Sequence, residues 1–412
     1  MKKSYYIVFI LLLYAVAAHC QTLGFKFIDD QKQVRIPFEL HSNLIVVPVI
    51  LNNQLPLRFI LDTGVRTTIL TEKAYSDILD LEYNKKYIIS GIGSENRDIE
   101  AYITNGVTLS MPGVKGMGHA MLVLEEDYLE LRNYLGTEVH GILGYEVFSR
   151  FIVKIDYDNK VLILTTPEHF KPKRSYDEIP IIIEDTKPYI QTSITYNSGD
   201  SPIPVKLMID SGASHGLLLD SKSDNSLYIP EKNLDCNLGR GLAGNLQGKI
   251  ARIQNFKIGN RSWDDVLITF PTSSSLLDSI KRGDVFRNGS IGGEILSRFK
   301  VIFDFPGERI YLKKGKDFKK KFSYNISGIN VKAKGSRLNS FEITEVRPGS
   351  SGDLAGFKKG DTILSINNVA SKSLNLGHII GMLNARENKR VSITVQRGGE
   401  RYSATFRLHS QI

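Results

Sequence analysis

The chain has 412 residues, of which 42% are hydrophobic and 24% are charged. This length and composition predict an ordinary globular protein of two or three domains with sizeable cores. The net charge is +9, and much of it comes from Lys313, Lys314, Lys316, Lys319, Lys320 and Lys321. No base-reading motif accompanies these lysines, so we expect a solvated linker there and no nucleic-acid partner.

The first 20 residues have the features of a secretory signal peptide. Residues 1–3 carry two lysines, and residues 5–18 are apolar but too short and too terminal for a membrane span. We expect cleavage after Cys20, an exported protein that is periplasmic or secreted, and no transmembrane span in the mature chain. A lipid attached at Cys20 is the less favoured alternative, because His19 fits it poorly. Cleavage would leave Cys236 as the only cysteine, so no internal disulfide is expected.

The segments that follow predict strands and tight turns. Residues 34–51 alternate and are rich in Val, Ile and Leu, which is typical of strands. The apolar run 59–61 then leads into Asp62-Thr63-Gly64, which predicts a carboxylate held in a turn at the end of a buried strand. A hairpin is expected over 87–109, with Gly91-Ile92-Gly93 at its glycine-rich tip. An ordinary surface hairpin is the alternative interpretation.

The same order of segments occurs again. The apolar run 207–209 precedes Asp210-Ser211-Gly212, and a second glycine-rich tip with Gly241 and Leu242 follows it. Residues 141–157 align without gaps on residues 289–305. An isolated Asp-Thr/Ser-Gly triplet would most simply be a turn whose Asp bonds its own backbone.

The spacing argues against chance. The distance from Asp62 to Gly144 is 82 residues, and so is the distance from Asp210 to Gly292. The same two segments thus occur twice with the same separation, which indicates an internal duplication of about 148 residues. A repeat of this length suits two lobes rather than a solenoid. Residues 168–179 are polar and unpatterned, as expected of the connection between the lobes.

Two lobes that each carry one Asp turn and one later apolar-apolar-Gly segment resemble the aspartic peptidases of the pepsin and retropepsin type, over about residues 25–315. The resemblance implies a mainly β, two-lobed β-barrel fold with lobe 1 at 25–168 and lobe 2 at 178–315. It also implies two carboxylates that share one proton and activate water to hydrolyse a peptide bond. No cofactor is implied, and no metal-ligand spacing occurs in the sequence.

The resemblance assigns roles to matching residues. Asp62 and Asp210 would be the catalytic dyad, Thr63 and Ser211 would bond across the lobe interface, Gly64 and Gly212 would let the backbones approach, and Gly144 and Gly292 would pack behind the dyad. The hairpins that carry Gly91-Ile92-Gly93 and Gly241-Leu242 resemble flaps that close over substrate. No Tyr stands at the first tip, so the retropepsin-like members are the closer comparison.

Three features depart from the family pattern or compete with it. Val65 and Ala213 stand where family members often carry a hydroxyl that favours the ionised dyad, so we expect raised dyad pKa values and activity nearer neutral pH. Arg66 is either an ion-pair residue or a substrate contact, and it puts activity in question.

Residues 212–216 fit the G-x-S-x-G pattern of serine hydrolases. The strand-like run after them and the lack of a later His in the same lobe favour a structural role for Ser214 and His215.

Residues 341–368 closely resemble a PDZ domain of the bacterial protease-associated type, and the resemblance covers about 325–410. It implies a small α+β domain that binds chain ends or extended peptides by strand addition. The peptide-binding loop would be Ser327-Gly328-Ile329-Asn330, facing a helix at 374–385. A PDZ domain that only packs on the peptidase lobes is the alternative.

The sequence therefore predicts an exported aspartic endopeptidase whose PDZ domain docks a peptide or protein substrate, or a regulator. Two other classes remain open. An inactive peptidase fold would serve as a PDZ-linked peptide-binding module, and a scaffold led by the PDZ domain would bind partners without cleaving them.

Overall fold

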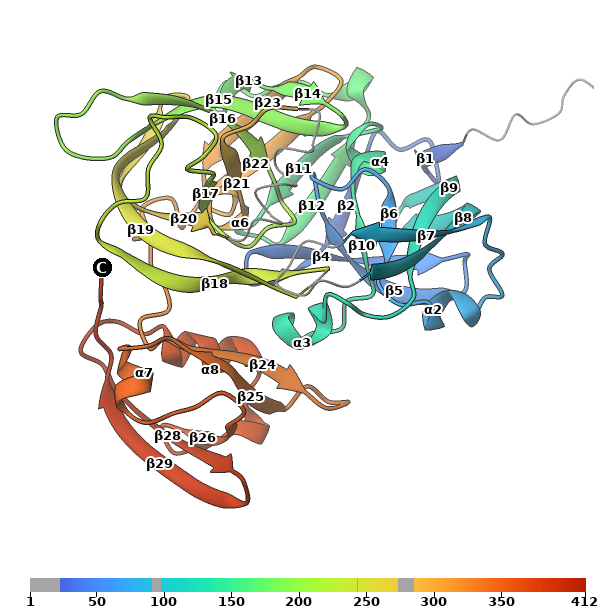
Figure 1. The fold of residues 1–412 in the computed structure, drawn as a ribbon. Helices are drawn as coiled ribbons and strands as arrows, with labels where there is room; N and C mark the ends of the chain where they lie inside the picture. The colour runs from blue at the N-terminus through green and yellow to red at the C-terminus, as the bar shows by residue number, and fades with distance from the viewer. Residues whose placement is uncertain (1–22, 91–97, 243, 273–284) are drawn as a thin grey trace, which may run out of the picture.

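Figure 1 shows the computed structural model, which describes residues 23–90, 98–242, 244–272 and 285–412. The described residues form four β-sheets with short helices between the strands. The chain is thus mainly β, as the sequence predicted. Two lobes lie together at the top of Figure 1, and the C-terminal domain lies beneath them. The expected signal peptide lies outside the described residues.

Lobe 1 is built on one sheet. Its strands are β1 (Gly24–Phe27), β3 (Glu39–His41), β4 (Leu44–Leu51), β5 (Leu55–Leu61), β6 (Thr68–Leu70), β7 (Lys85–Ser90), β8 (Asp98–Met111), β9 (Val114–Leu124) and β10 (Gly141–Leu143). The helices are α2 (Ala74–Asp77), α3 (Leu131–Leu135) and α4 (Tyr145–Phe148). The β4–β5 turn uses Asn52 and Asn53 at φ 48° and 58°, a left-handed conformation that Asn tolerates better than most residues.

Lobe 2 repeats this arrangement in a second sheet. Its strands are β14 (Ile182–Glu184), β15 (Lys187–Thr195), β16 (Ile203–Ile209), β17 (Leu217–Leu219), β18 (Asn233–Gly241), β19 (Gly244–Ile258), β20 (Arg261–Pro271) and β21 (Gly289–Ile291), followed by α6 (Gly293–Leu296). The strand predicted after the G-x-S-x-G match is β17. A nucleophile elbow needs a helix at that place, so the structure supports the structural interpretation of the match.

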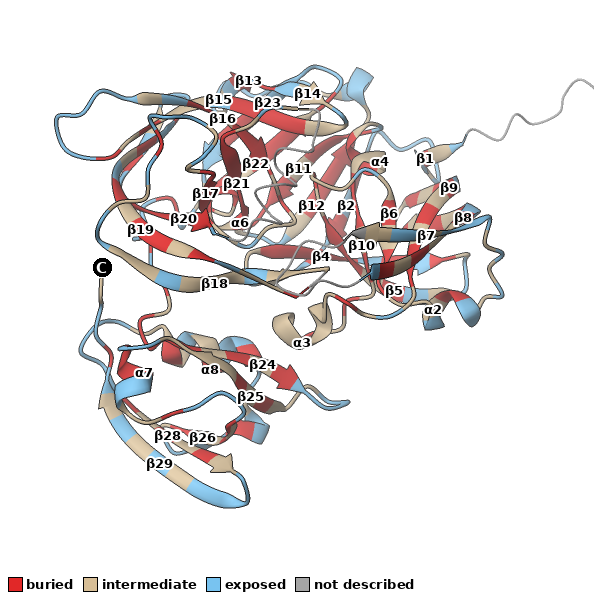
Figure 2. Ribbon diagram, in the orientation of Figure 1, coloured by how far each residue is buried: buried red, intermediate tan, exposed pale blue. Residues whose placement is uncertain are grey.

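A third sheet belongs to both lobes. Its order is β13 (Asp177–Pro180), β23 (Arg309–Lys314), β22 (Phe299–Asp304), β11 (Ile152–Asp156), β12 (Val161–Thr165) and β2 (Gln33–Pro37). The lobes join where β11 pairs antiparallel with β22. The connection η1 (Pro167–His169) leads from β12 towards β13. Strands β22, β11 and β12 of this sheet are mostly buried (Figure 2), so the sheet fixes the lobes to each other.

The C-terminal domain has its own sheet and helices. Its elements are β24 (Ile329–Lys334), β25 (Ser340–Val346), α7 (Ser351–Leu354), β26 (Thr362–Ile366), β27 (Val369–Ala370), η2 (Ser371–Ser373), α8 (Leu376–Leu383), β28 (Arg390–Arg397) and β29 (Glu400–Arg407). Strand β24 lies at the edge of the sheet and pairs with β25. Helix α8 is shorter than the predicted 374–385, because Asn375 caps its first turn by accepting a hydrogen bond from the His378 amide.

The predicted solvated linker is only partly correct. All six lysines between 313 and 321 are exposed, but Lys313 and Lys314 end strand β23. Phe318 and Phe322 then bury their rings, and the Trp263 indole donates to the Phe318 carbonyl at 2.9 Å. Two apolar side chains in a basic stretch therefore attach the connection to lobe 2 instead of leaving it free.

Candidate active site

Strands β5 and β16 carry the two Asp turns. Each runs parallel to a short strand of its own lobe, β10 or β21. The Asp62 amide donates to the Leu143 carbonyl at 2.8 Å, and the Asp210 amide donates to the Ile291 carbonyl at 2.9 Å. The sheet hydrogen bonds thus continue into each Asp residue, so both carboxylates stand on rigid backbone.

The two later glycines lie directly behind these turns. A Cβ atom on Gly144 would lie 2.1 Å from the Val65 carbonyl oxygen, and one on Gly292 would lie 2.3 Å from the His215 carbonyl oxygen. These distances are too short for any side chain at either position. The structure therefore places both glycines where the family resemblance puts them.

Two hydroxyl residues tie the turns together across the lobe interface. Thr63 Oγ1 donates to the Ile209 carbonyl at 2.6 Å and accepts from the Ser211 amide at 3.0 Å. Ser211 Oγ donates to the Leu61 carbonyl at 2.9 Å and accepts from the Thr63 amide at 3.1 Å. Both residues are fully buried. Each hydroxyl therefore satisfies two buried groups, and the lobes cannot separate here without leaving four hydrogen bonds unmade.

The two carboxyl groups lie against each other's turns. Asp62 Oδ1 accepts from the Gly64 amide at 2.6 Å, and Asp210 Oδ1 accepts from the Gly212 amide at 3.0 Å. A Cβ atom on Gly212 would lie 2.1 Å from Asp62 Cγ, and one on Gly64 would lie 3.5 Å from Asp210 Oδ1. Glycine is thus required at 212 because the opposite carboxyl group fills the space a side chain would take.

The environment of Asp62 favours its protonated form. Burial raises the pKa of Asp62 well above its ordinary value, and the charge of Asp210 and a hydrogen bond with that side chain raise it further. The amides of Gly64 and Gly212 act in the opposite direction and lower the pKa. Burial and the like charge dominate, so the pair holds a proton more tightly than an isolated Asp does.

Val65 and Ala213 stand where family members often carry a hydroxyl, and their main-chain carbonyls accept hydrogen bonds. The Val65 carbonyl accepts from the Tyr145 amide at 2.9 Å, and the Ala213 carbonyl accepts from the Gly293 amide at 2.7 Å. Neither side chain can donate a hydrogen bond to a carboxylate. The dyad therefore lacks the stabilisation of its charged form that a hydroxyl at these positions would give.

Arg66 lies in an ion pair between the lobes. Its Nη1 is 3.3 Å from Asp185 Oδ1, and the two side chains are 69% and 52% exposed. At the equivalent place in the other lobe, Asn43 Nδ2 donates to the Ser214 carbonyl at 3.2 Å. Of the two interpretations left open by the sequence, the structure supports the ion pair.

A cleft between the lobes reaches Asp210. Its volume is about 420 Å³. Lobe 2 contributes Asp210, Met208 and Arg287, and lobe 1 contributes mainly apolar side chains from and around α3, namely Leu44, Leu129, Leu131, Tyr134 and Leu135. An apolar cleft with a few polar groups is typical of a ligand-binding site.

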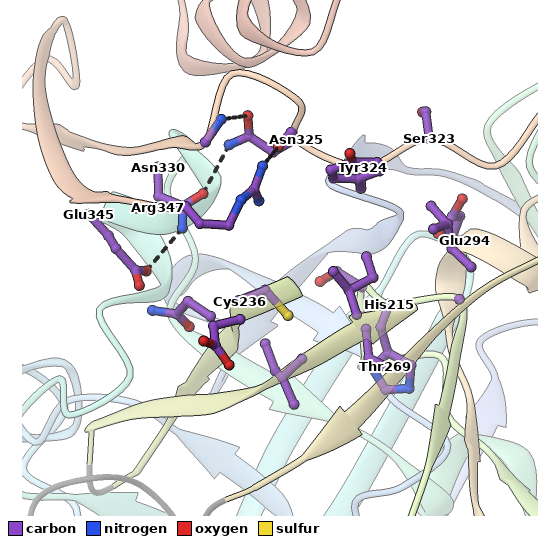
Figure 3. A pocket seen from close by; sticks show the side chains of 18 of the residues that line it. His215, Cys236, Thr269, Glu294, Ser323, Tyr324, Asn325, Asn330, Glu345 and Arg347 are labelled. Atoms are coloured by element: carbon purple, nitrogen blue, oxygen red, sulfur yellow. Dashed lines mark hydrogen bonds between the residues drawn. The ribbon is translucent and has the colours of Figure 1, made fainter. Parts of the chain in front are cut away.

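A second cavity of about 230 Å³ adjoins the cleft (Figure 3). Ser214, His215 and Leu238 line both. Side chains of the C-terminal domain and its connection, including Tyr324, Asn325 and Arg347, form the other wall. His215 Nε2 lies 3.0 Å from Ser290 Oγ, and burial lowers the pKa of this imidazole. His215 is therefore held neutral as part of the wall.

One hairpin of lobe 2 crosses towards lobe 1. Gly241 and Leu242 lie at the tip of β18–β19, and Leu242 packs against an apolar cluster of lobe 1 formed by Ile99, Ala101, Leu124 and Tyr128. Arg240 Nε donates to the Tyr128 carbonyl at 3.1 Å, and Arg240 Nη2 lies 3.1 Å from Glu130 Oε1. The other predicted tip, Gly91-Ile92-Gly93, lies outside the described residues.

Nothing in the sequence singles out Arg240 or Glu130 as a site residue. Glu130 is one of four acidic residues between 125 and 130, and Arg240 lies near the end of β18, so no pattern or spacing distinguishes either from other charged residues. Their partnership depends on how the lobes pack, which only the structure provides.

The four residues of the predicted PDZ peptide-binding loop lie in two different environments. Ser327 and Ile329 are buried, and Ser327 Oγ donates to Asn325 Oδ1 at 2.7 Å and accepts from the Ile329 amide at 3.2 Å. Gly328 and Asn330 line the smaller cavity instead. The Ser327 hydroxyl therefore holds the turn that leads into β24.

Comparison with protein families matches two parts of the chain. Residues 47–147, from β4 into α4, match the family model described as Aspartyl protease. Residues 342–397, from β25 to the end of β28, match the model described as PDZ domain. The chain contains an aspartyl protease domain and a PDZ domain. A search of curated proteins found no match.

A PDZ domain implies peptide binding. Among the described residues, no helix is both long and apolar enough to cross a membrane. The same residues contain no cluster of three or more His, Cys, Asp or Glu side chains that could hold a metal ion.

Proposed function

We propose that the protein is an aspartic endopeptidase in which Asp62 and Asp210 activate a water molecule. The single observation that carries this proposal is the reciprocal hydrogen bonding of Thr63 and Ser211, which fixes the two Asp turns face to face. A peptide-binding fold without catalysis has no need to bring two partly buried carboxyl groups together, because doing so is electrostatically costly.

The proposed reaction uses a dyad that shares one proton. The ionised carboxylate takes a proton from water as the water oxygen attacks the scissile carbonyl carbon, while the protonated carboxyl donates its proton to the carbonyl oxygen. The newly protonated carboxyl then gives its proton to the amide nitrogen, while the newly ionised carboxylate takes a proton from a hydroxyl of the tetrahedral intermediate. The C–N bond breaks, and the dyad again holds one proton. The products are a free carboxylate and a free amine, with no covalent enzyme intermediate.

The cleft supports an extended peptide as substrate. Its apolar wall at α3 suits hydrophobic side chains, and the β18–β19 hairpin lies over it in contact with lobe 1. A hairpin in this place excludes water from the chemistry, which strengthens the electrostatic action of the dyad. We propose that the PDZ domain docks the same substrate or a regulator beside the cleft.

We further propose that the protein is exported before it acts. The signal-like residues 1–20 support this. Burial raises the pKa of the Cys236 thiol to about 12, so this cysteine is a weak nucleophile that suits an oxidising compartment.

The proposal is tested by incubating the purified protein with a mixed peptide library at pH 3 to 8 and identifying the products by mass spectrometry. Cleavage should be abolished by Asp62→Asn and by Asp210→Asn. Since nothing at Val65 or Ala213 stabilises the charged dyad, activity should extend towards neutral pH, and a profile that peaks below about pH 4 would contradict this part. A folded protein that binds but never cleaves would instead favour the peptide-binding module.

A further inference from the structure

The edge strand of the PDZ domain already has an occupant from lobe 1. Strand β24 pairs with β25 on one side, and α3 of lobe 1 lies against its other side. Asn133 Nδ2, on α3, donates to the main-chain carbonyl of Ala333 at 2.8 Å. A peptide that adds to a PDZ domain forms main-chain hydrogen bonds with this kind of strand edge.

The contact extends to both sides of the PDZ surface. Arg132 Nη2 donates to the Ser336 carbonyl at 2.8 Å, just beyond β24. Gly136 lies against α8, because a Cβ atom there would be 2.6 Å from the Leu376 Cβ. Residues 132–136 therefore occupy the space between β24 and the start of α8.

The opposite face of α3 belongs to the catalytic cleft. Leu131, Tyr134 and Leu135 line the cleft, while Arg132 and Asn133 contact the PDZ domain. One short helix thus forms a wall of the cleft and covers the PDZ edge. Any movement that uncovers β24 alters the cleft.

Glu130, which precedes α3, links the PDZ domain to the hairpin over the cleft. Its Oε2 lies 2.7 Å from Lys332 Nζ on β24, and its Oε1 lies 3.1 Å from Arg240 Nη2 on β18. The three side chains are only 14–27% exposed. A single carboxylate therefore neutralises two cations from different domains, and either ion pair depends on where α3 lies.

We propose that α3 of lobe 1 competes with an extended peptide for the β24–α8 surface of the PDZ domain, and that peptide binding releases the β18–β19 hairpin from lobe 1. The incoming main chain takes the place of Asn133 at the Ala333 carbonyl. Displacement of α3 withdraws Glu130 from Arg240, so the hairpin loses its ionic contact and the cleft opens to substrate. This regulation rests on the proposed peptidase function, but the structural coupling does not.

The coupling is tested by hydrogen exchange with mass spectrometry on the full chain, comparing Lys332→Ala with Lys334→Ala. Both lysines are on β24, but Lys334 pairs with Glu342 inside the PDZ domain at 2.6 Å. Lys332→Ala should speed exchange about two- to fivefold in both 131–136 and the end of β18, the size expected for one partly exposed ion pair. Lys334→Ala should change neither segment. Faster exchange in 131–136 with an unchanged β18 would overturn the coupling.

The competition is tested with a pool of ten-residue peptides that have four random C-terminal residues and a free carboxyl end. Saturating pool should speed exchange in 131–136 and β18 of the Asp210→Asn protein, which cannot consume it. Asn133→Ala should increase retention of the pool about two- to fivefold. Retention of the pool with unchanged exchange in 131–136 would overturn the competition.

Activity separates the two proposals. Lys332→Ala should raise kcat/KM for the library by a factor similar to its effect on exchange, while Lys334→Ala should not. If no variant cleaves peptide but the exchange pattern is as expected, the peptidase proposal fails and the competition stands. If cleavage occurs and Lys332→Ala leaves both exchange and kcat/KM unchanged, the competition fails and the peptidase stands.

Discussion

The two lobes share their centre and differ at their edges. At the centre, residues 148 positions apart make matching hydrogen bonds, as Thr63 and Ser211 do across the interface. At the edges, the matching arginines have different neighbours. Arg150 is exposed and donates to the Leu23 carbonyl at 3.1 Å. Arg298 is 3% exposed and lies 3.7 Å from the centre of the Phe322 ring in the connection to the PDZ domain.

The difference follows from what each lobe must hold. A shared proton needs two carboxyl groups in equivalent settings, so the turns have little freedom to diverge. Around them, Arg150 of lobe 1 holds the N-terminal segment before β1, whereas Arg298 of lobe 2 holds a connection with a further domain attached. The same arginine position therefore makes a weak surface contact in one lobe and a buried anchor in the other.

The largest expected effect tests the equality of the two carboxylates. Asp62→Asn and Asp210→Asn should each reduce kcat/KM about 10⁴-fold or more, because each removes a proton acceptor or donor that the other cannot replace. Asp185→Asn, which removes an exposed Asp from the inter-lobe ion pair, is the control and should keep activity within about twofold. Unequal losses between the first two variants would show that the lobes do not share the chemistry.

The hydroxyls of Thr63 and Ser211 should contribute equally to the free energy of unfolding. Thr63→Val and Ser211→Ala should each lower the free energy of unfolding by about 2–4 kcal/mol, because each leaves one buried amide and one buried carbonyl without a partner. Urea unfolding followed by fluorescence measures this. Losses that differ by more than about 1.5 kcal/mol, a margin set by ordinary context effects, would mean that one lobe dominates the interface.

Arg150 and Arg298 should contribute unequally to the free energy of unfolding. Arg298→Ala should cost about 2–3 kcal/mol, because it removes a buried cation beside Glu294 and Phe322. Arg150→Ala should cost about 0.5 kcal/mol, since its contact is exposed. The same unfolding measurement compares them, and equal costs would contradict the anchoring role of Arg298.

Because the pKa of Asp62 is raised in the folded protein, replacing Asp62 by Asn should increase stability at pH 7. Below about pH 3.8, the ordinary value, Asp62 is protonated in both folded and unfolded chains. As pH rises towards the raised folded pKa, ionisation costs more in the folded state, so the native protein loses stability. Asp62→Asn should therefore raise Tm at pH 7 by about 2–4 °C and have little effect at pH 3.

Asp361 is the matched control for this pH effect. Asp361 is buried, and it pairs with Arg397, a residue of opposite charge, through two contacts of 2.6 Å. Asp361→Asn should lower Tm at pH 7, opposite in sign to Asp62→Asn. If both variants shift Tm in the same direction, the like-charge explanation for Asp62 is wrong.

The smallest effect concerns Arg66. Its ion pair with Asp185 is exposed, so Arg66→Ala should change the free energy of unfolding by less than about 0.5 kcal/mol and leave kcat near that of the parent. A steady-state assay at low and high salt measures this. A large loss of kcat would return Arg66 to the list of substrate contacts.

The sequence predicted the parts of this molecule that are set locally. Apolar runs, glycines and repeated spacing were enough to predict the turns at Asp62 and Asp210 and the glycines behind them. The contacts of Glu130 with Lys332 and Arg240 could not be predicted, because they join three segments whose only shared property is their position in the folded chain. Phe318 and Phe322 were missed because the surrounding lysines dominated the local composition.

The sheet shared by both lobes has a consequence for synthesis of the chain. Strand β11 ends at Asp156, but its partner β22 begins only at Phe299. At a typical rate of translation, roughly ten to thirty seconds pass between the two. During that time the edge of β11 has no neighbour on that side, and it offers a template for pairing with other chains. The duplicated architecture thus leaves the nascent N-terminal half with an unpaired strand edge until lobe 2 has been made.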